Sequence, residues 1–296
     1  MEKTRIFCIF AGDFRVRHKS MATSIHIADQ LFGTDRPLLM AVVNVTPDSF
    51  FARSRATDEA SLRQAVEHAV DTGADILDIG ACSTRPAVQS GGGQIEELAD
   101  EQHELERLEW ALQLIRRMQV KVPLSVDTFR PAIARHVIEN YGVALINDVS
   151  GGTEAMFTLA AEKKVAYVLT YNRSHAQHST DDIVADALHA LSSGADALHR
   201  LGVSDVLIDP GFGFGQTVEQ SLRLLADMQV LQQIGCPILV GVSRKRMAYE
   251  PHGLTPDTCL EQTLDLERQA LVRGANILRV HDVAATREMI NDYAVK

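Results

Sequence analysis

The sequence predicts a (β/α)8 barrel (a TIM barrel) preceded by a short β-hairpin. Eight apolar runs rich in β-branched residues alternate with eight runs of helical periodicity. Because a helix separates each strand from the next, the strands should be parallel, and eight such units of this length close into a barrel. Five helical runs end in a glycine just before the next strand, as a helix C-cap requires: Gly73, Gly142, Gly202, Gly235 and Gly274.

The expected elements follow one another in a regular order. A hairpin at 24–37 comes first. The strands are expected at 38–45, 74–80, 123–128, 144–150, 166–171, 205–211, 237–243 and 276–282. The helices that follow them are expected at 59–73, 95–118, 131–142, 154–164, 181–202, 218–235, 256–274 and 283–294. The chain then divides into an N-terminal extension with the hairpin, 1–36, and one barrel domain, 37–296.

An open, doubly wound parallel sheet is the alternative architecture. Such a sheet usually carries a glycine-rich phosphate loop after its first strand. Here the first strand runs into "NVTPDSF", 44–50, which is not a GxGxxG sequence. The barrel is therefore the favoured prediction.

Composition and charge restrict the class of protein. The 296 residues are 46% hydrophobic, which suits a globular chain with a full core, and no apolar run approaches the roughly 20 residues of a membrane helix. The first residues contain no signal sequence with a cleavage site, so we expect a cytoplasmic protein that does not bind membranes. The net charge of −10 argues against nonspecific nucleic-acid binding. Four cysteines without CxxC spacing indicate reduced thiols.

Every expected strand ends in polar residues, and in a barrel these ends converge on the face that holds the active site. The residues at the strand ends are Asn44; Asp78 with Ser83, Thr84 and Arg85; Asp127; Asn147 and Asp148; Tyr171, Asn172 and Arg173; Asp209; Ser243, Arg244 and Lys245; and Arg279, His281 and Asp282. Any single Asp or Asn in such a place is more often a cap or a turn former. Asp148 and Asp282 fit that role, and Asp78 could simply anchor its loop.

The chemistry of the set points to a polar heterocycle that carries a diphosphate. Asp127, Asn147 and Asp209 are acceptors suited to an N–H edge of a ring. Positive charge for a phosphate-like group is expected from three residues, Arg85, Arg279 and His281. Asn44 offers a neutral oxygen to Mg²⁺, which usually keeps water and substrate phosphates as its other ligands.

Seven stretches resemble the dihydropteroate synthases, the folate-pathway enzymes that sulfonamides inhibit. They are "MAVVNVTPDSF", "DILDIGACSTRP", "SVDTFRP", "INDVSGG", "LIDPGFGFG", "ILVGVSRKRM" and "ILRVHDV", in the family's order from about Leu38 to the C-terminus. The resemblance implies an enzyme that joins 4-aminobenzoate to 6-hydroxymethyl-7,8-dihydropterin diphosphate in the presence of Mg²⁺. It also implies a homodimer.

The family's functional positions can be carried over residue by residue. The resemblance assigns the pterin ring to Asp127, Asn147, Asp209 and Lys245, and the metal to Asn44. It assigns the diphosphate to Arg85, Arg279 and His281. The aminobenzoate pocket would contain Phe50, Thr84, Pro86 and Phe214. Lys245, Arg85, His281 and Asn44 are the residues expected to act in catalysis.

Two stretches depart from the family pattern and keep other functions open. After the fifth strand the family usually has Met-His-x-Arg-Gly, whereas this chain reads "LTYNRSH", with Thr170 in place of the Met. The seventh helix reads "CLEQTLDLE" and lacks the family's small Gly-Ser pair. One alternative is a pterin-binding paralogue with weak or no synthase activity. A more remote one is a barrel methyltransferase domain that acts on a folate.

Overall fold

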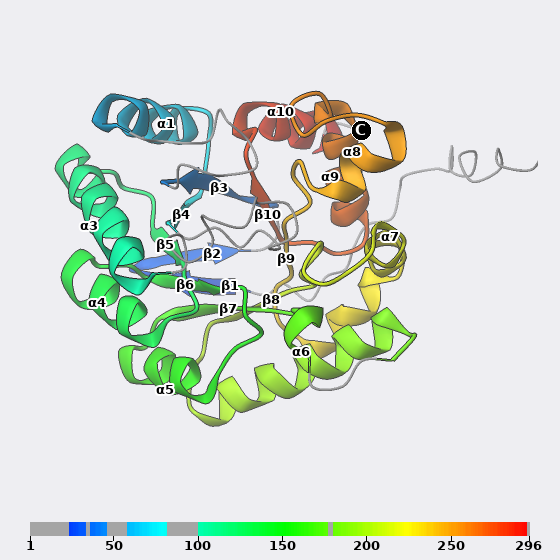
Figure 1. The fold of residues 1–296 in the computed structure, drawn as a ribbon, viewed down its shortest axis with the longest axis horizontal. Helices are drawn as coiled ribbons and strands as arrows, with labels where there is room; N and C mark the ends of the chain where they lie inside the picture. The colour runs from blue at the N-terminus through cyan, green and yellow to red at the C-terminus, as the bar shows by residue number, and fades with distance from the viewer. Residues whose placement is uncertain (1–23, 34–35, 46–57, 82–99, 177–179, 295–296) are drawn as a thin grey trace, which may run out of the picture.

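The computed structural model describes residues 24–33, 36–45, 58–81, 100–176 and 180–294, and these form an eight-stranded parallel barrel (Figure 1). The barrel strands are β3 (Leu38–Asn44), β4 (Ile76–Gly80), β5 (Leu124–Asp127), β6 (Leu145–Asp148), β7 (Ala166–Thr170), β8 (Val206–Asp209), β9 (Leu239–Val240) and β10 (Ile277–Val280). They pair in the order β8-β7-β6-β5-β4-β3-β10-β9, and a bridge between Ile208 and Ile238 closes the ring. The predicted barrel is therefore confirmed.

Helices surround the barrel (Figure 1). They are α1 (Glu59–Asp71), α3 (Glu101–Met118), α4 (Pro131–Tyr141), α5 (Glu154–Lys163), α6 (Ile183–Arg200), α7 (Val218–Ala226), α8 (Arg246–Tyr249), α9 (Leu260–Val272) and α10 (Val283–Ala294). Short 3-10 segments cover η3 (Arg173–His175), η4 (Met228–Ile234) and η5 (Glu250–His252). The five glycines expected to end helices all adopt positive φ, between 69° and 98°. No helix in the described part of the chain is long and apolar enough to cross a membrane.

One expected helix, 218–235, is divided in the structure. The α7 helix ends at Ala226 and the 3-10 segment η4 continues from Met228. Leu224, Leu225, Met228 and Leu231 are all buried, and this helical spacing is why the sequence indicates one continuous helix. At the break, the Arg273 guanidinium donates to the Ala226 carbonyl over 3.1 Å, so a distant side chain takes an acceptor that a continuous helix would use itself.

The predicted hairpin is also confirmed, as β1 (Ser24–Ile27) and β2 (Gln30–Gly33). Ile25 and Ile27 are almost fully buried and pack against the first residues of the barrel strands, including Leu38 and Ile277. The His26 backbone N–H donates to Asp205 over 2.7 Å and fixes the hairpin to the chain just before β8. The hairpin therefore closes the amino-terminal end of the barrel, and leaves the carboxyl ends of the strands free to build a site.

Side chains alternate between two cores, as the pleat of a strand requires. One face of each strand packs against the surrounding helices in a large apolar cluster. The other face fills the barrel interior near its amino-terminal end, where Met40, Leu145, Val168 and Leu207 are buried. Further along the same strands, the inner face continues toward the carboxyl ends with the polar residues Asn44, Asn147, Thr170 and Asp209.

Candidate active site

The carboxyl ends of the strands place the predicted ring-binding residues on the inner face of the barrel. Strand register sets Asn44, Gly80, Asp127 and Asn147 in one row across β3, β4, β5 and β6. Asp209 lies on β8, two residues beyond the level of that row, where it pairs with the last residue of β7. These residues share their strand face with the apolar residues of the barrel interior. The structure therefore brings four separately predicted positions to one end of the barrel.

Asp78 is the centre of a buried hydrogen-bond network on this inner face. Its side chain is fully buried. One carboxylate oxygen accepts from Ser125 Oγ over 2.6 Å, and the other accepts from Asn147 Nδ2 over 3.0 Å and from Arg279 Nε over 2.7 Å. The expectation that Asp78 anchors its own loop is corrected, because these three partners lie on three other strands. Its position two residues before Gly80, on the inner face, is the sequence signal that could have identified it.

Arg279 is held by two carboxylates. Besides Asp78, it donates from Nη2 to Asp127 Oδ2 over 2.9 Å. Burial raises the pKa of Asp127 to about 7; Arg279 opposes the shift, and Asp78 adds to it. Burial thus favours the neutral form of the Asp127 carboxyl, whereas the Arg279 guanidinium favours the ionised form that accepts its hydrogen bond.

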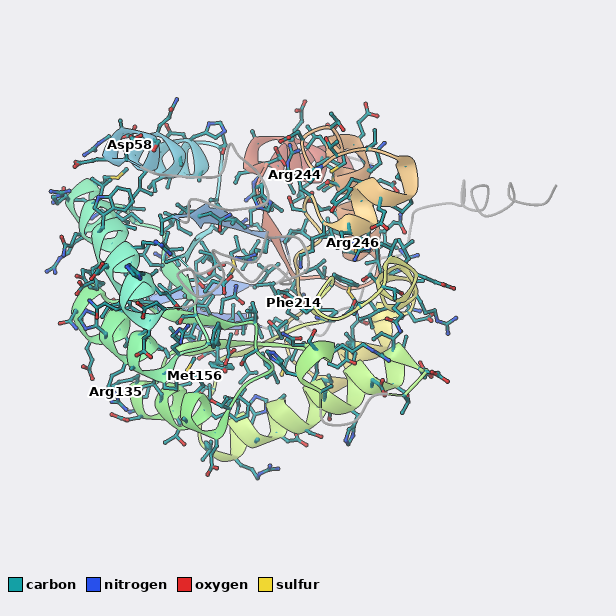
Figure 2. All side chains as sticks on the ribbon, viewed as in Figure 1. Asp58, Arg135, Met156, Phe214, Arg244 and Arg246 are labelled. Carbon is teal, nitrogen blue, oxygen red and sulfur yellow. The ribbon has the colours of Figure 1, made fainter. Side chains whose placement is uncertain are left out.

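Lys245 follows β9, the neighbour of β8 in the barrel, and its charge interacts with that of Asp209. Its ammonium donates to the Phe212 carbonyl over 2.6 Å and lies 4.9 Å from the centre of the Phe214 ring. Burial lowers the pKa of Lys245 to about 8, and Asp209 partly offsets that shift. Burial also raises the pKa of Asp209, which Lys245 opposes. Phe214, which is labelled in Figure 2, lies in the chain between β8 and α7, and Phe212 is fully buried in the core.

His281 differs from the expectation of a positively charged ligand for phosphate. Burial lowers its pKa to about 3, and the neighbouring Arg279 guanidinium lowers it further. The imidazole is therefore neutral at pH 7. Its backbone N–H donates to Ser243 Oγ over 3.2 Å, and its Nδ1 lies 3.1 Å from the same oxygen. In the ligand-free state His281 can donate a hydrogen bond to an anion, but its imidazole carries no positive charge.

Arg244 connects the ends of β9 and β10. It adopts a left-handed backbone conformation with φ of 55°. Its guanidinium forms two hydrogen bonds of 2.7 Å to the Asp282 carboxylate and a third to the Pro256 carbonyl. The expectation that Asp282 caps a helix is corrected, because its carboxylate binds Arg244. Asp148 does form the expected turn, accepting from the Ser150 backbone over 2.8 Å.

Asn44 is the residue whose surroundings suit a hard cation. It ends β3 beside Gly80, and a Cβ on Gly80 would lie 3.3 Å from Asn44 Oδ1. A side chain at position 80 would therefore crowd this neutral oxygen. No group of three or more His, Cys, Asp or Glu that could hold a metal occurs among the described residues. A neutral amide oxygen such as Asn44 Oδ1 belongs to the oxygen ligands that Mg²⁺ accepts.

Four predicted residues lie outside the described part of the chain: Phe50, Thr84, Arg85 and Pro86. They belong to the stretches 46–57 and 82–99. The described residues bring together Asn44, Asp127, Asn147, Asp209, Phe214, Lys245, Arg279 and His281 at the carboxyl ends of the strands. Sequence reasoning named Asp78 at a strand end but assigned it no ligand, and it did not name Ser125.

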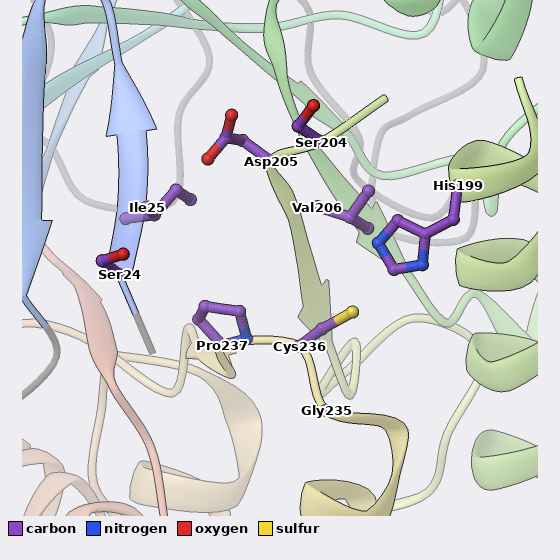
Figure 3. Close-up of a pocket in the computed structure, with 9 residues that line it drawn as sticks. All are labelled: Ser24, Ile25, His199, Ser204, Asp205, Val206, Gly235, Cys236 and Pro237. Carbon is purple, nitrogen blue, oxygen red and sulfur yellow. The ribbon is translucent and has the colours of Figure 1, made fainter. Parts of the chain in front are cut away.

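A small pocket of about 130 Å³ lies at the opposite end of the barrel, beside the hairpin (Figure 3). Ser24, Asp205 and Cys236 are among the residues that line it. The Asp205 carboxylate accepts the His26 backbone N–H. Burial raises the pKa of the Cys236 thiol to about 11, so the thiol is protonated at neutral pH and unreactive. The polar groups of this pocket therefore serve to hold the hairpin. The candidate active site is the opposite end of the barrel, at the carboxyl ends of the strands.

Comparison with known proteins gives a consistent match. The family model described as pterin binding enzyme matches residues 40–281. A dihydropteroate synthase of Clostridium beijerinckii is 32% identical over 256 residues, which cover 84% of this chain and 90% of that protein. A protein of Mycobacterium leprae named inactive dihydropteroate synthase 2 is 33% identical over 269 residues, which cover 86% of this chain and 89% of that protein.

Solved structures agree with this match. The dihydropteroate synthase of Thermus thermophilus, crystallised in complex with 6HMPPP, is 34% identical and superposes with a TM-score of 0.78. The superposition covers 92% of this chain and 99% of that one. The same enzyme has been crystallised in complex with 4-aminobenzoate, and that structure superposes with a TM-score of 0.77. The chain therefore belongs to the dihydropteroate synthase family of pterin-binding enzymes.

Proposed function

We propose that this protein is a dihydropteroate synthase, which condenses 6-hydroxymethyl-7,8-dihydropterin diphosphate with 4-aminobenzoate to give 7,8-dihydropteroate and diphosphate. The observation that carries the proposal is the inward-facing set formed by Asp78, Asp127, Asn147, Asp209 and Arg279 at the barrel mouth. Asp78, Asp127 and Arg279 satisfy one another, whereas Asn147 Oδ1 is buried without a partner among the described residues and costs stability unless a ligand satisfies it. The relatives crystallised with 6HMPPP and with 4-aminobenzoate support the same substrates here.

The ring would bind to fixed acceptors on the inner face. Asn147 Nδ2 is held by Asp78, so Oδ1 of the same amide is presented as an acceptor. Asp209 offers a carboxylate whose Oδ1 already accepts the Gly211 backbone N–H over 2.7 Å, which orients the group. A flat heterocycle with an N–H and NH₂ edge matches this arrangement. Lys245, above the ring of Phe214, would bind a ring carbonyl or nitrogen.

The diphosphate would leave toward the strand ends of β3 and β10. Asn44 and His281 lie there, and Arg85 belongs to the stretch that follows β4. Magnesium bound with the diphosphate would neutralise charge on the leaving group. Arg279 is already bound to Asp78 and Asp127, so it would contribute positive charge from below the substrate and not as a free side chain.

The substitution would proceed by a dissociative path. The carbon–oxygen bond breaks first, and its electron pair leaves with the diphosphate. The resulting pterin methylene cation is then attacked by the amine of 4-aminobenzoate, whose nitrogen loses a proton after the new carbon–nitrogen bond has formed. The protein would supply orientation and electrostatic stabilisation, with the carboxylates of Asp78 and Asp209 near the positively charged ring. No strong general base is required. We further propose that the protein is cytoplasmic and forms a homodimer, as in the family; sedimentation velocity can test the dimer.

A direct assay tests the proposal. Purified protein is mixed with the pterin diphosphate, Mg²⁺ and 4-aminobenzoate, and dihydropteroate is measured by chromatography. We expect turnover by the wild type and a loss of at least tenfold in Asp209→Ala, because that change removes a carboxylate that should pair with the ring. Asp205→Ala is the matched control, since Asp205 lies at the other end of the barrel beside the hairpin. No product under conditions where a known synthase turns over would refute the proposal.

A pterin-binding protein without synthase activity is the second candidate. It is favoured by the 33% identity to the inactive protein of Mycobacterium leprae, which is close to the 32% identity to the synthase of Clostridium beijerinckii. Calorimetry separates the two functions. A catalytically inactive paralogue would bind the pterin but would not bind 4-aminobenzoate in the presence of diphosphate, whereas a synthase should bind both.

A further inference from the structure

Thr170, the last residue of β7, carries a buried hydroxyl that has no hydrogen-bond partner within the described part of the chain. Among the described residues, four buried side-chain atoms lack a partner: Asn147 Oδ1, Thr170 Oγ1, Tyr171 OH and Glu267 Oε1. Asn147 and Thr170 belong to the inner face of the barrel at its carboxyl-terminal end. We propose that the Thr170 hydroxyl is a specificity-determining group that hydrogen-bonds the polar edge of the bound heterocycle. This inference rests on the proposed function.

The position of Thr170 is set by the strands around it. It shares its face of β7 with Ala166 and Val168, which are buried inside the barrel. Its direct neighbour across the sheet is Asp209 on β8. Thr170 itself is only 1% exposed, so bulk water does not solvate its hydroxyl. The side chain therefore lies inside the barrel, next to a carboxylate proposed to bind the ring.

The methyl group of Thr170 faces the loop after β8. A Cβ built on Gly211 would lie 3.1 Å from Thr170 Cγ2, so the methyl packs closely against this glycine. The hydroxyl occupies a different position on the same β-carbon. Asp209 does not satisfy it, because Asp209 Oδ1 accepts the Gly211 backbone N–H and no bond to Thr170 is formed.

In the ligand-free protein the buried hydroxyl of Thr170 lowers stability, because it has lost its hydrogen bonds to water and no protein group that the structure describes replaces them. Valine has the same shape, suits a β-strand and removes that cost. Thr128 provides the contrast, because its equally buried hydroxyl donates to Glu104 Oε1 over 2.7 Å. The hydroxyl of Thr170 is therefore available to form a hydrogen bond with a bound ligand.

The chemistry of a hydroxyl complements its neighbours. The carboxylate of Asp209 accepts hydrogen bonds when ionised, and the ammonium of Lys245 donates them. A hydroxyl can do both, so it can pair with a ring nitrogen or carbonyl as a donor, or with an amino group as an acceptor. The ligand that fits is a planar nitrogen heterocycle with alternating donors and acceptors along the edge that meets Asp209.

Two substitutions with opposite chemistry test the role of Thr170. Thr170→Val removes the hydroxyl and keeps the shape, whereas Thr170→Ser keeps the hydroxyl. The probe is 6-hydroxymethyl-7,8-dihydropterin, whose Kd is measured by calorimetry, together with the Tm of each ligand-free protein. We expect Thr170→Val to weaken binding roughly fivefold to tenfold and to raise the ligand-free Tm by about 2–4 °C. Thr170→Ser should bind within about threefold of the wild type.

Thr128→Val is the matched control, since it removes a buried hydroxyl that already has a partner. It should lower the Tm and leave pterin affinity unchanged. Unchanged affinity in Thr170→Val, or a lower Tm in that variant, would overturn the inference, because the hydroxyl would then be structural. Failure of the wild type to bind the pterin is a distinct result: it would refute the proposed function and, with it, the ligand assigned to Thr170.

Discussion

Asp78 on β4 and Arg279 on β10 form a buried ion pair inside the barrel, with Asp78 Oδ2 2.7 Å from Arg279 Nε. The two residues are 201 positions apart in the chain. The same carboxylate also accepts hydrogen bonds from Ser125 and Asn147, so its network links side chains on four strands. Its removal should disturb both the stability of the barrel and the geometry of the site.

Asp78→Ala is predicted to lower the free energy of unfolding by roughly 3–5 kcal/mol, because it leaves the Arg279 guanidinium with a single carboxylate partner and releases Asn147. Urea unfolding followed by circular dichroism measures the effect. Where the variant still folds, its affinity for the pterin should fall as well. Asp75→Ala is the control: Asp75 binds Arg36 and Arg287 outside the site, so its loss should reduce stability but not pterin affinity. Equal pterin affinity in Asp78→Ala and the wild type would contradict the positioning role.

Lys245 should make stability depend on alkaline pH. Its pKa is about 8 in the folded protein, against 10.5 for an ordinary lysine, so between these values the unfolded chain binds a proton that the folded protein has released. The unfolding free energy contributed by Lys245 therefore rises with pH across this window. Relative to Lys245→Met, the wild type should gain roughly 1–3 kcal/mol between pH 7.5 and pH 10.5. A difference between the two proteins that stays constant with pH would show that the lysine titrates normally.

Glu267 on α9 should have the opposite effect in a lower pH range. Burial raises its pKa to about 8, and the hydrogen bond that its carboxyl accepts from Thr286 Oγ1 over 2.9 Å only partly opposes this shift. Between pH 4.5 and pH 8 the folded protein keeps a proton that the unfolded chain loses, so stability falls as pH rises. Glu267→Gln removes this titration. Its unfolding free energy should increase relative to the wild type by roughly 2–4 kcal/mol from pH 4.5 to pH 8. Parallel pH profiles for both proteins would rule this out.

Gly211 should not tolerate a side chain. Its φ is +68°, and a Cβ there would lie 1.8 Å from the Tyr171 carbonyl oxygen, which is backbone and cannot move aside easily. Gly211→Ala is predicted to cost about 3 kcal/mol or more of unfolding free energy, measured in urea. Gly142→Ala is the matched control, because its φ is +69° and nothing lies within 4 Å of its Cβ position. That variant should lose only about 1 kcal/mol, the cost of the backbone conformation alone. Similar losses in the two variants would contradict the steric explanation.

The local features of the fold could be predicted because each depends on a few neighbouring residues. Strand and helix periodicity, the five glycines at helix ends and the hairpin are all encoded within short windows of the chain. The division of the expected 218–235 helix could not be found in this way. It involves Arg273, which lies far along the chain and donates to the Ala226 carbonyl.

In the candidate site, too, some features could be predicted from the sequence and others could not. From the sequence by itself came the barrel, the polar strand ends and the family resemblance, since parallel strands must present their carboxyl ends at one face. Only the tertiary structure decided which of these groups pair: Arg279 with Asp78 and Asp127, Arg244 with Asp282, and Lys245 with the Phe212 carbonyl. It also decided that His281 is neutral and that Thr170 has no partner. Pairing and protonation depend on burial and on distances across the closed barrel, and barrel closure brings together residues far apart in the chain, such as Leu38 and Ile277.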